Sequence, residues 1–290
     1  MGKGNPVSRV VYVNGDFVRE KEAKVSVFDR GFLFGDGVYE VCSVLDGKLI
    51  DKDAHLARLG RSLESLKMNC PASLEDITSI QRELIAKNGI VEGTIYLQVT
   101  RGVADRDFNF PNSVTPSLVI FTQKKNLLND PIAGKGISVI TLPDIRWRRR
   151  DIKTVMLLPA SLAKQEALER GAGDAWLVED GYVTEGSANN AYIVTMGGVI
   201  VTRQLTHSIL HGITRKAVLK LAEQDGYEVE ERAFTPGEAC EAAEAFITSA
   251  SSFVTPVVKI NDRVLCNGIP GPVTSKLRRL YIEMARAEAE

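Results

Sequence analysis

One polar segment constrains the fold of this 290-residue chain most strongly, because it divides the sequence into two parts. Residues 124–136 contain Asn, Asp, Pro and two Gly, which are residue types that interrupt helices and strands. We expect residues 1–124 to form a small N-terminal α/β domain, 125–134 an interdomain linker and 135–290 a larger C-terminal domain. A chain of this length is long enough to build two modest domains, each with its own core.

The N-terminal part mixes strands and helices. Asn14 and Gly15 between two β-branched runs predict a hairpin, because this pair favours the tight turns that hairpins use. Ser73 is a suitable N-cap for a helix that Asn88 and Gly89 end. The expected elements are a hairpin over residues 10–18, helices over 53–68 and 73–88, and strands over 94–101 and 117–124.

The C-terminal part continues the mixture, so the predicted fold class is α+β. Its expected strands cover residues 137–142, 175–183, 190–202, 245–248 and 256–260, with a turn at Gly197 and Gly198 inside 190–202. Its expected helices cover residues 160–170, 212–224 and 272–287.

Charge, hydropathy and cysteine content exclude several classes of protein. A net charge of −1 argues against a general nucleic-acid binder. No run of about 18 apolar residues is present to cross a membrane. The four cysteines stand far apart without paired spacing, which predicts neither a disulfide framework nor a metal site and is typical of the cytoplasm.

Lys153 stands between a group of cations and an apolar run. Four arginines lie within the seven residues before it, and residues 155–158 are all apolar. Nearby positive charge and burial both disfavour an ammonium ion, so we expect a lowered pKa for Lys153. A neutral lysine amine is a nucleophile toward aldehydes. The alternative, which these residues alone leave open, is a solvated strand end or loop rich in Arg and Lys.

Three further stretches add to the chemistry of Lys153. A helix that begins near Gly212 offers backbone N–H groups and the Thr214 hydroxyl to an anion. Residues 248–252 follow a strand and are rich in small hydroxyl side chains, and Glu185 is a single carboxylate among small polar residues. Singly, each stretch is more typical of a cap or turn. Together they match the needs of pyridoxal phosphate: a lysine for its aldehyde, anion-binding groups for its phosphate and a carboxylate for its pyridinium nitrogen.

Seven motifs then appear in one order along the chain. They are residues 28–41 (FDRGFLFGDGVYEV), 55–59 (HLARL), 151–154 (DIKT), 162–167 (LAKQEA), 184–187 (TEGS), 209–215 (ILHGITR) and 246–249 (FITS). In these motifs the chain resembles the fold-type IV pyridoxal-phosphate transaminases, the family that includes the D-amino-acid and branched-chain aminotransferases. The resemblance implies two domains with the active site between them, a cofactor-binding C-terminal domain, and a homodimer whose partner chain completes each site.

The resemblance also assigns roles to single residues. It implies that Lys153 is the Schiff-base lysine and proton carrier, and that Glu185 pairs with the pyridine nitrogen. Ala250 stands where the family usually has a hydroxyl residue, so only its backbone N–H would contribute. The further cofactor contacts that the resemblance implies are Arg58, Arg146, Leu210, Ile213, Thr214, Ser249 and Ala250.

Two stretches resemble the D-amino-acid enzymes more than the branched-chain enzymes: VYEV at residues 38–41 and the Trp-containing run 145–153. The resemblance places Tyr39 near the ring hydroxyl and the substrate, and a carboxylate clamp in residues 105–111. Arg106 matches the arginine of the clamp, but Phe108 replaces its histidine, and a phenyl ring cannot donate a hydrogen bond. Either the clamp is weakened or rebuilt, or Arg106 suffices and Phe108 only packs the loop.

The activity that the resemblance implies is transfer of an amino group from a D-amino acid such as D-alanine to 2-oxoglutarate or pyruvate. Relaxed specificity that includes (R)-amines is a variant of this hypothesis. The alternatives are a branched-chain L-amino-acid transaminase, an aminodeoxychorismate lyase and a catalytically silent cofactor-binding protein. The partners expected in the first case are small molecules, with no nucleic acid and no membrane.

Overall fold

A computed structural model describes residues 9–289, and the chain divides into two compact units. The second unit contains Leu127–Asp151 and Leu157–Ala287, so the chain passes from the first unit to the second beside the expected linker. One segment differs from the expected division. Ile152–Met156, which carries Lys153, belongs to the first unit and not to the C-terminal one, because Thr154 forms an antiparallel β-bridge with Val38.

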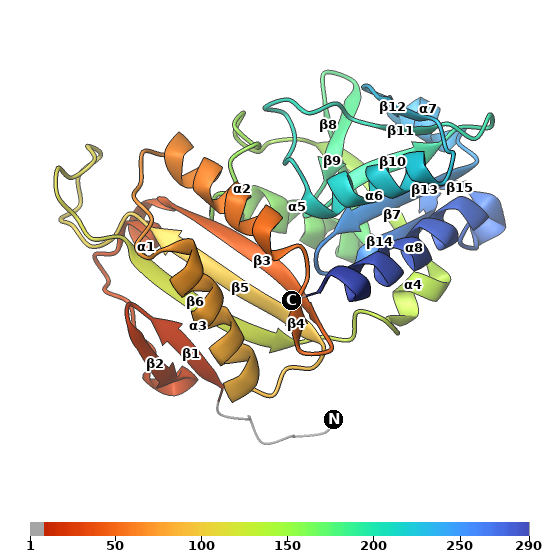
Figure 1. The fold of residues 1–290 in the computed structure, drawn as a ribbon. Helices are drawn as coiled ribbons and strands as arrows, with labels where there is room; N and C mark the ends of the chain where they lie inside the picture. Colours follow the sequence, from red (N-terminus) through yellow and green to blue (C-terminus); the bar gives the residue numbers. More distant parts are fainter. Residues whose placement is uncertain (1–8, 290) are drawn as a thin grey trace. The chain divides into compact units, whose positions relative to one another are not determined.

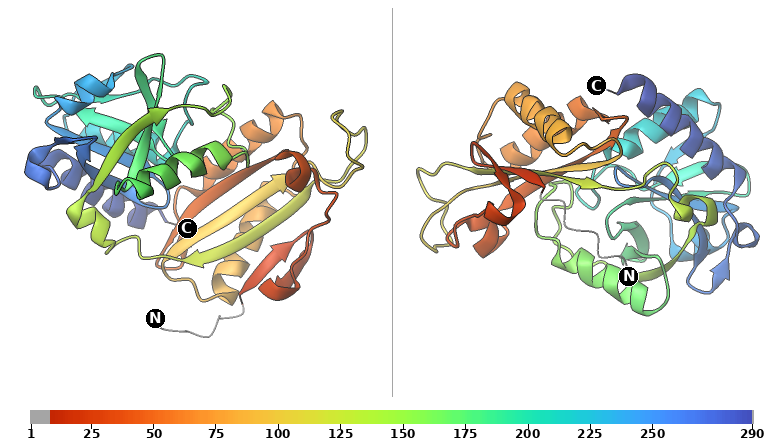
Figure 2. Two further views of the ribbon diagram at one scale, coloured as in Figure 1. Left: turned by 180° about the vertical axis from the view of Figure 1, so that it is seen from behind. Right: turned by 90° about the horizontal axis from the view of Figure 1, so that it is seen from below.

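The first unit is built on a six-stranded antiparallel sheet in the order β2-β1-β6-β5-β3-β4. Its strands are β1 (Val10–Val13), β2 (Asp16–Arg19), β3 (Gly37–Leu45), β4 (Lys48–Leu49), β5 (Gly93–Thr100) and β6 (Ser117–Lys124). Its helices are η1 (Glu20–Glu22), α1 (Arg30–Phe34), α2 (Lys52–Ser65) and α3 (Leu74–Lys87). Figures 1 and 2 show α2 and α3 on the same face of this sheet.

Local sequence signals account for much of this unit. Asn14 and Gly15 both have positive φ angles, as the predicted hairpin turn requires, and the hairpin is confirmed. The Ser73 side chain accepts a hydrogen bond from the Asp76 backbone N–H, which confirms the predicted start of α3. The apolar stripes of α2 and α3 meet the sheet in one core that includes Leu59, Leu63, Ile77, Leu84, Ile95 and Leu97.

The longest strand of the first unit, β3, was not among the predicted strands. Nearly all of its residues are buried, so its sequence lacks the alternation of polar and apolar positions that marks a half-exposed strand. The strand pairs with β5 along its whole length and carries Tyr39 and Glu40.

The second unit contains a nine-stranded mixed sheet in the order β12-β11-β10-β13-β14-β7-β8-β9, with β15 beside β14. Its strands are β7 (Ile137–Pro143), β8 (Asp174–Glu179), β9 (Tyr182–Gly186), β10 (Asn190–Val194), β11 (Ile200–Thr202), β12 (Val229–Glu231), β13 (Glu244–Ser249), β14 (Phe253–Ile260) and β15 (Arg263–Val264). Its helices are α4 (Pro131–Lys135), α5 (Leu158–Glu169), α6 (Ile213–Gln224), α7 (Pro236–Cys240), η2 (Cys266–Gly268) and α8 (Pro272–Glu288). The predicted α+β fold class is confirmed.

One predicted strand of the second unit is wrong in a way that matters for the site. Residues 175–183 were expected as a single strand, but β8 and β9 form a hairpin across Asp180 and Gly181. Both residues have positive φ angles, and Asp-Gly is a strong hairpin signal that the prediction passed over. Glu185 therefore lies inside β9 and not after a strand.

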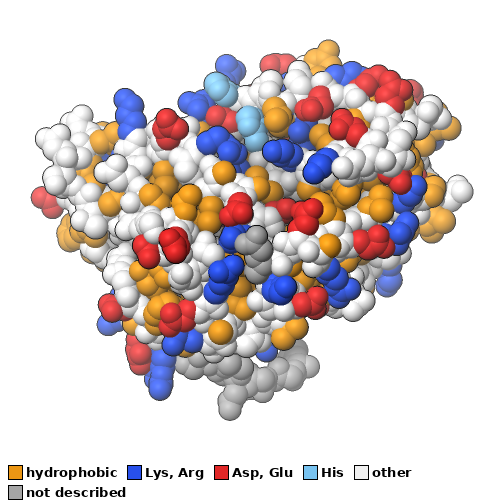
Figure 3. All heavy atoms as spheres, in the orientation of Figure 1, with side chains coloured by type: hydrophobic (Ala, Val, Ile, Leu, Met, Phe, Trp, Pro, Cys, Tyr) orange, Lys and Arg blue, Asp and Glu red, His pale blue; other side chains and the backbone are white. Residues whose placement is uncertain are grey.

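The surface carries charges of both signs, in agreement with the net charge of −1. On the face that Figure 3 shows, Lys and Arg side chains are interspersed with Asp and Glu. Among the described residues, no helix is long and apolar enough to cross a membrane.

Candidate active site

Lys153 is placed by backbone contacts with the start of β3 in the first unit. The Tyr39 N–H donates to the Lys153 carbonyl at 3.0 Å, and the Val155 N–H donates to the Gly37 carbonyl at 3.1 Å. The half-buried Lys153 side chain brings its Nζ to 4.1 Å from the centre of the Tyr39 ring. The two site residues Lys153 and Tyr39 are thus adjacent in the structure, with the amine over an aromatic face.

Tyr39 belongs to a row of aromatic side chains that the sequence did not reveal. Its ring stacks on Tyr96 of β5 at 5.5 Å, and Tyr96 stacks on Phe121 of β6 at 4.7 Å. Burial and the neighbouring Tyr39 raise the pKa of Tyr96 above its ordinary value. Since β3, β5 and β6 are separated by long stretches of sequence, only their pairing in the sheet brings these rings together.

Arg58 on α2 is buried in a charged triad with Glu40 and His55. Its Nε and Nη2 donate to the two Glu40 carboxylate oxygens at 2.7 and 2.8 Å, and His55 Nδ1 lies 2.7 Å from Glu40 Oε2. Burial by itself would raise the pKa of Glu40, but the charge and hydrogen bonds of Arg58 and His55 lower it to about 2. The predicted phosphate ligand Arg58 is therefore held in place by a bidentate ion pair.

Three of the four arginines that precede Lys153 in the sequence are paired with carboxylates: Arg146, Arg149 and Arg150. Arg149 binds Asp151 through Nη2 at 2.9 Å, and Arg150 binds Glu179 through Nη1 at 2.8 Å. The sequence interpretation treated these arginines as like charge crowded beside Lys153, whereas the structure offsets their charges locally.

Glu185 in β9 is a buried carboxylate of the second unit, with 3% of the residue exposed. Arg146 Nη1 donates to its Oε1 at 2.6 Å, and Oε2 accepts from Asn190 Nδ2 at 2.9 Å and from the Leu210 N–H at 3.1 Å. The structure thus brings the predicted residues Arg146, Glu185 and Leu210 together. A carboxylate has about four lone-pair positions, so these three donors leave about one for a further donor.

Arg146 is shared with a second carboxylate, Asp144, which sequence reasoning missed. Asp144 accepts from Arg146 Nε at 2.9 Å and Nη2 at 2.7 Å, and from the Thr184 hydroxyl at 2.7 Å. Burial raises the pKa of Glu185 above its ordinary value, although the charge of Arg146 opposes this. Sequence reasoning also missed Asn190 of β10, whose side chain reaches Glu185 of β9 across residues 187–189.

The start of α6 has the features of an anion site. Its N-cap is Gly212, which has no side chain that could cap the helix. The first backbone N–H groups of α6 therefore receive no hydrogen bond from an N-cap side chain. The Thr214 Oγ1 is buried without a hydrogen-bond partner, which costs about 1–3 kcal/mol unless a ligand binds it. A Cβ at Gly212 would lie 2.1 Å from Asn190 Oδ1, so this turn requires glycine. Ile213 and Thr214 therefore occupy positions that suit a phosphate.

The loop of residues 249–252 follows β13, which packs against α6. The Ser249 and Ser252 hydroxyls are 2.8 Å apart, and the Ser252 N–H donates to the Ser249 carbonyl at 3.4 Å. Ser249 and Ala250 are both only partly buried. This tight turn of small residues is the second predicted phosphate contact.

Arg106 and Phe108 lie together in an exposed loop of the first unit. The Arg106 guanidinium carbon is 5.6 Å from the centre of the Phe108 ring and 5.4 Å from that of Phe34. The two rings contact each other edge to face at 5.7 Å, although 79% of Phe108 is exposed. Phe108 therefore offers Arg106 an aromatic face where the family clamp offers a histidine.

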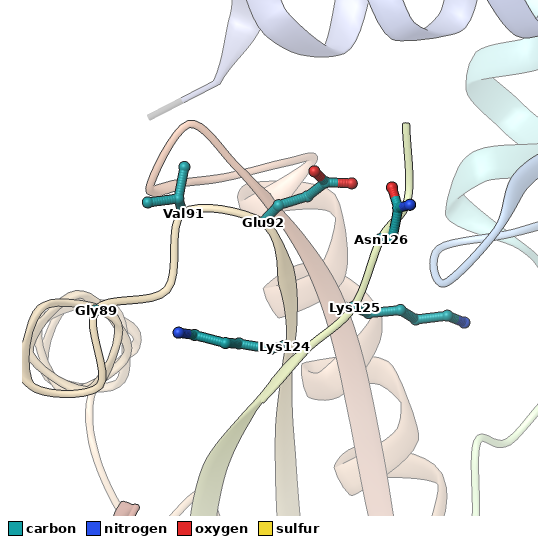
Figure 4. Close-up of a pocket in the computed structure, with 6 residues that line it drawn as sticks. All are labelled: Gly89, Val91, Glu92, Lys124, Lys125 and Asn126. Carbon is teal, nitrogen blue, oxygen red and sulfur yellow. The ribbon is translucent and has the colours of Figure 1, made fainter. Parts of the chain in front are cut away.

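A separate surface pocket of about 430 Å³ lies in the first unit (Figure 4). The residues that line it include none of the predicted site residues: Gly89, Val91, Glu92, Lys124, Lys125 and Asn126. Figure 4 shows Lys124 and Lys125 pointing to opposite sides, so their charges do not converge on one ligand. We assign no chemistry to this pocket.

The described residues fit pyridoxal phosphate. An amine over a tyrosine ring, a buried carboxylate with about one vacant acceptor position, and an unsatisfied hydroxyl at a helix start are what its aldehyde, ring nitrogen and phosphate require. Lys153, Tyr39, Arg58, Arg106 and Phe108 lie in the first unit. The second unit holds Arg146, Glu185, Leu210, Ile213, Thr214, Ser249 and Ala250.

Comparisons with known proteins give one consistent family. The family model for amino-transferase class IV matches residues 37–260. A D-alanine aminotransferase of Staphylococcus aureus (strain N315) is 39% identical over 277 residues, covering 94% of this chain and 98% of the relative. One of Bacillus licheniformis is 40% identical over 271 residues, covering 92% and 94%.

Solved structures of branched-chain aminotransferases share the fold. The enzyme of the thermophilic archaeon Thermoproteus uzoniensis, solved with norvaline, has a TM-score of 0.84 and 27% identity, covering 97% of this chain and 96% of that one. The Escherichia coli enzyme has a TM-score of 0.89 and 24% identity, covering 98% and 96%.

Proposed function

Because the chain belongs to the class IV aminotransferases, we propose that it moves an amino group from a D-amino acid, such as D-alanine, to 2-oxoglutarate or pyruvate. The observation that carries the choice of donor is the 39–40% identity to D-alanine aminotransferases over more than nine-tenths of the chain. A second candidate, a branched-chain L-amino-acid transaminase, is favoured only by solved structures of lower identity, such as the Thermoproteus uzoniensis enzyme at 27%.

Pyridoxal phosphate, the cofactor of this family, supplies an aldehyde that takes up the amino group and a ring that accepts an electron pair. Lys153 provides the amine that would hold the aldehyde. Once the amino group of the donor has displaced it, the same Nζ would carry the proton from the substrate carbon to the aldehyde carbon of the cofactor. The Tyr39 ring supports this amine from one side and limits its access to water.

Glu185 would accept a hydrogen bond from the protonated pyridine nitrogen, because three donors already occupy its other acceptor positions and about one is left. The charge of Arg146 favours the ionised form of this carboxylate, against the larger effect of burial on its pKa. Arg58, the N–H groups of Ile213 and Thr214, and the loop of residues 249–252 bind the phosphate. Arg106 binds the α-carboxylate of the donor, with Phe108 and Phe34 holding the guanidinium by their ring faces.

We also propose a homodimer in which each chain lends its Arg106 loop to the partner's site, and a cytoplasmic location. The exposed position of the loop and the resemblance to the family support the first proposal. The four cysteines, all free of disulfides, support the second.

Borohydride reduction of the purified enzyme tests the cofactor assignment. After proteolysis, the pyridoxyl group should appear on the peptide that contains Lys153, and Lys153→Ala should lose both this label and turnover. Lys164→Ala is the matched control, because Lys164 bonds to the Gly173 carbonyl and has no assigned role. A label on another lysine would contradict the assignment.

A stereochemical screen tests the choice of donor. With 2-oxoglutarate as acceptor, D-alanine should turn over faster than L-leucine and L-valine. Faster turnover of the L-amino acids would select the branched-chain alternative. Pyruvate release from an aminodeoxychorismate substrate without an acceptor would select the lyase. Measurable turnover of (R)-amines would show relaxed specificity within the main proposal.

A further inference from the structure

We propose that Arg278 on α8 is a positioning residue that holds the loop of residues 249–252 in the shape that binds the cofactor phosphate. This inference rests on the proposed function, since it takes pyridoxal phosphate as the ligand. Arg278 belongs to none of the motifs that identify the family.

The Arg278 guanidinium is buried, with 9% of the residue exposed, and it binds backbone carbonyls at the end of the loop. Its Nη1 donates to the Ser252 carbonyl at 2.7 Å and to the Val254 carbonyl at 2.9 Å. Its Nη2 donates to the Leu127 carbonyl at 2.6 Å, near the start of the second unit. One side chain thus fixes the exit of the loop to both α8 and the chain after residue 126.

The residue between Ser252 and Val254 has a strained backbone. Phe253 has a φ of +61°, a left-handed conformation that is unfavourable for a bulky residue and persists only when its surroundings impose it. Its buried ring lies 5.2 Å from the Tyr281 ring and 5.7 Å from the Arg278 guanidinium carbon. Helix α8 therefore supplies both the hydrogen bonds and the packing that keep this turn strained.

Ser252, which Arg278 binds, is in turn hydrogen-bonded to Ser249, the residue proposed to bind the phosphate. Ser252 connects to Ser249 through their hydroxyls at 2.8 Å and through the bond from its N–H to the Ser249 carbonyl. If Ser252 shifts, the Ser249 hydroxyl loses its orientation. Arg278 therefore acts on Ser249 through Ser252, without a contact of its own to Ser249.

Arg278 also differs from the other buried arginines in the groups that surround its charge. The five other buried arginines of the described chain each pair with a carboxylate: Arg30, Arg58, Arg101, Arg150 and Arg215. In the part of the chain that the structure describes, all hydrogen-bond acceptors of Arg278 are backbone carbonyls. Burial lowers the pKa of Arg278, and the charge of Asp130 opposes this without reversing it. A phosphate in the neighbouring loop would offset the charge of Arg278.

The test compares two ligands that differ only in the phosphate. Equilibrium dissociation constants for pyridoxal phosphate and pyridoxal are measured by absorbance on full-length protein freed of cofactor. Arg278→Met should weaken binding of pyridoxal phosphate by about 10-fold or more, the equivalent of one hydrogen bond to a charged group, and that of pyridoxal by less than about twofold. Arg279→Met is the matched control, because Arg279 is the next residue and forms an exposed pair with Glu283. It should change both constants by less than about twofold.

Equal weakening for the two ligands would overturn the proposal, since it would mean that Arg278 supports the unit in general. No change for either ligand would overturn it as well. If Arg278→Met does not fold, Arg278→Lys takes its place. Lysine keeps the charge but lacks the planar fork whose two nitrogens join the Ser252 and Val254 carbonyls to the Leu127 carbonyl. The lysine variant should show a phosphate-selective loss of about threefold or more. If the wild-type protein does not prefer pyridoxal phosphate over pyridoxal, the proposed function fails before Arg278 is tested.

Discussion

Each unit of the molecule buries a glutamate against an arginine, yet the two pairs behave in opposite ways. In the first unit, burial would raise the pKa of Glu40, but Arg58 and His55 lower it to about 2. In the second unit, burial raises the pKa of Glu185 in spite of Arg146. Both glutamates are almost fully buried, so the depth of burial does not explain the difference.

The explanation lies in how each arginine is shared. Arg58 gives two hydrogen bonds to Glu40. Arg146 gives one to Glu185 and two to Asp144, so its charge is divided between two carboxylates. Glu40 is therefore satisfied and structural, whereas Glu185 still favours another donor or positive charge. A protonated ring nitrogen is such a donor, so the comparison agrees with the proposed role of Glu185 at the cofactor and with a structural role of Glu40.

The largest expected effect is on catalysis at Glu185. Glu185→Gln should lower kcat about 10²–10³-fold, because an amide cannot hold a proton on the ring nitrogen as a carboxylate does. Steady-state kinetics with D-alanine as donor and 2-oxoglutarate as acceptor, in an assay that detects the pyruvate released, measure this loss. Glu179→Gln is the control, since Glu179 is a partly exposed carboxylate that pairs with Arg150. If Glu185→Gln keeps more than about a fifth of the wild-type kcat, Glu185 does not have the proposed catalytic role, and its functional contrast with Glu40 is lost.

The next effect is on stability at Glu40. Glu40→Gln leaves Arg58 buried without its counter-charge and should lower the free energy of unfolding by about 3–5 kcal/mol. Denaturant unfolding measures this change. Glu20→Gln is the control, because the Arg9–Glu20 pair is exposed and should leave the unfolding midpoint nearly unchanged. An equal response of the two variants would show that the Glu40 pair is not structural.

The pH dependence of stability follows from the same residue. The pKa of Glu40 is lower in the folded than in the unfolded protein, so its contribution is present above the unfolded value of 4.5. It is lost as the pH falls from 4.5 toward 2. Glu40→Gln should flatten the stability curve in this window. The raised pKa of Glu185 has the opposite effect on stability. Ionisation of Glu185 destabilises the cofactor-free fold as the pH rises through the pKa of the folded state.

The smallest effects concern Arg106, an arginine with aromatic rather than carboxylate neighbours. Arg106→Ala should raise KM for D-alanine about 10- to 100-fold, the loss of charge-assisted hydrogen bonds. Phe108→Leu should raise it about two- to fivefold, since it removes a cation–π contact. An (R)-amine without a carboxylate is the control substrate, and its KM should not change in either variant. A matching rise for the amine would mean that the loop supports the site without binding the carboxylate.

Prediction from the sequence succeeded where the signal is local. The Asn14-Gly15 hairpin and the Ser73 cap each depend on a few adjacent residues, and both are confirmed. Prediction failed for β3, which is buried along its length, and for the hairpin of β8 and β9. It also missed Asp144 and Asn190, because the sequence does not specify the side-chain directions that bring them to Arg146 and Glu185. It missed Tyr96 because this residue reaches Tyr39 only through the pairing of β3 with β5.

The sequence by itself determined the α+β class and the family, because ordered motifs and turn signals are properties of the chain. Only the tertiary structure decided which charges are satisfied. The pKa of a buried carboxylate depends on how many donors surround it and how they are shared, and these donors come from strands and loops distant in sequence. The same pairing of Glu with Arg therefore gave a structural pair at Glu40 and a site with room for one more donor at Glu185.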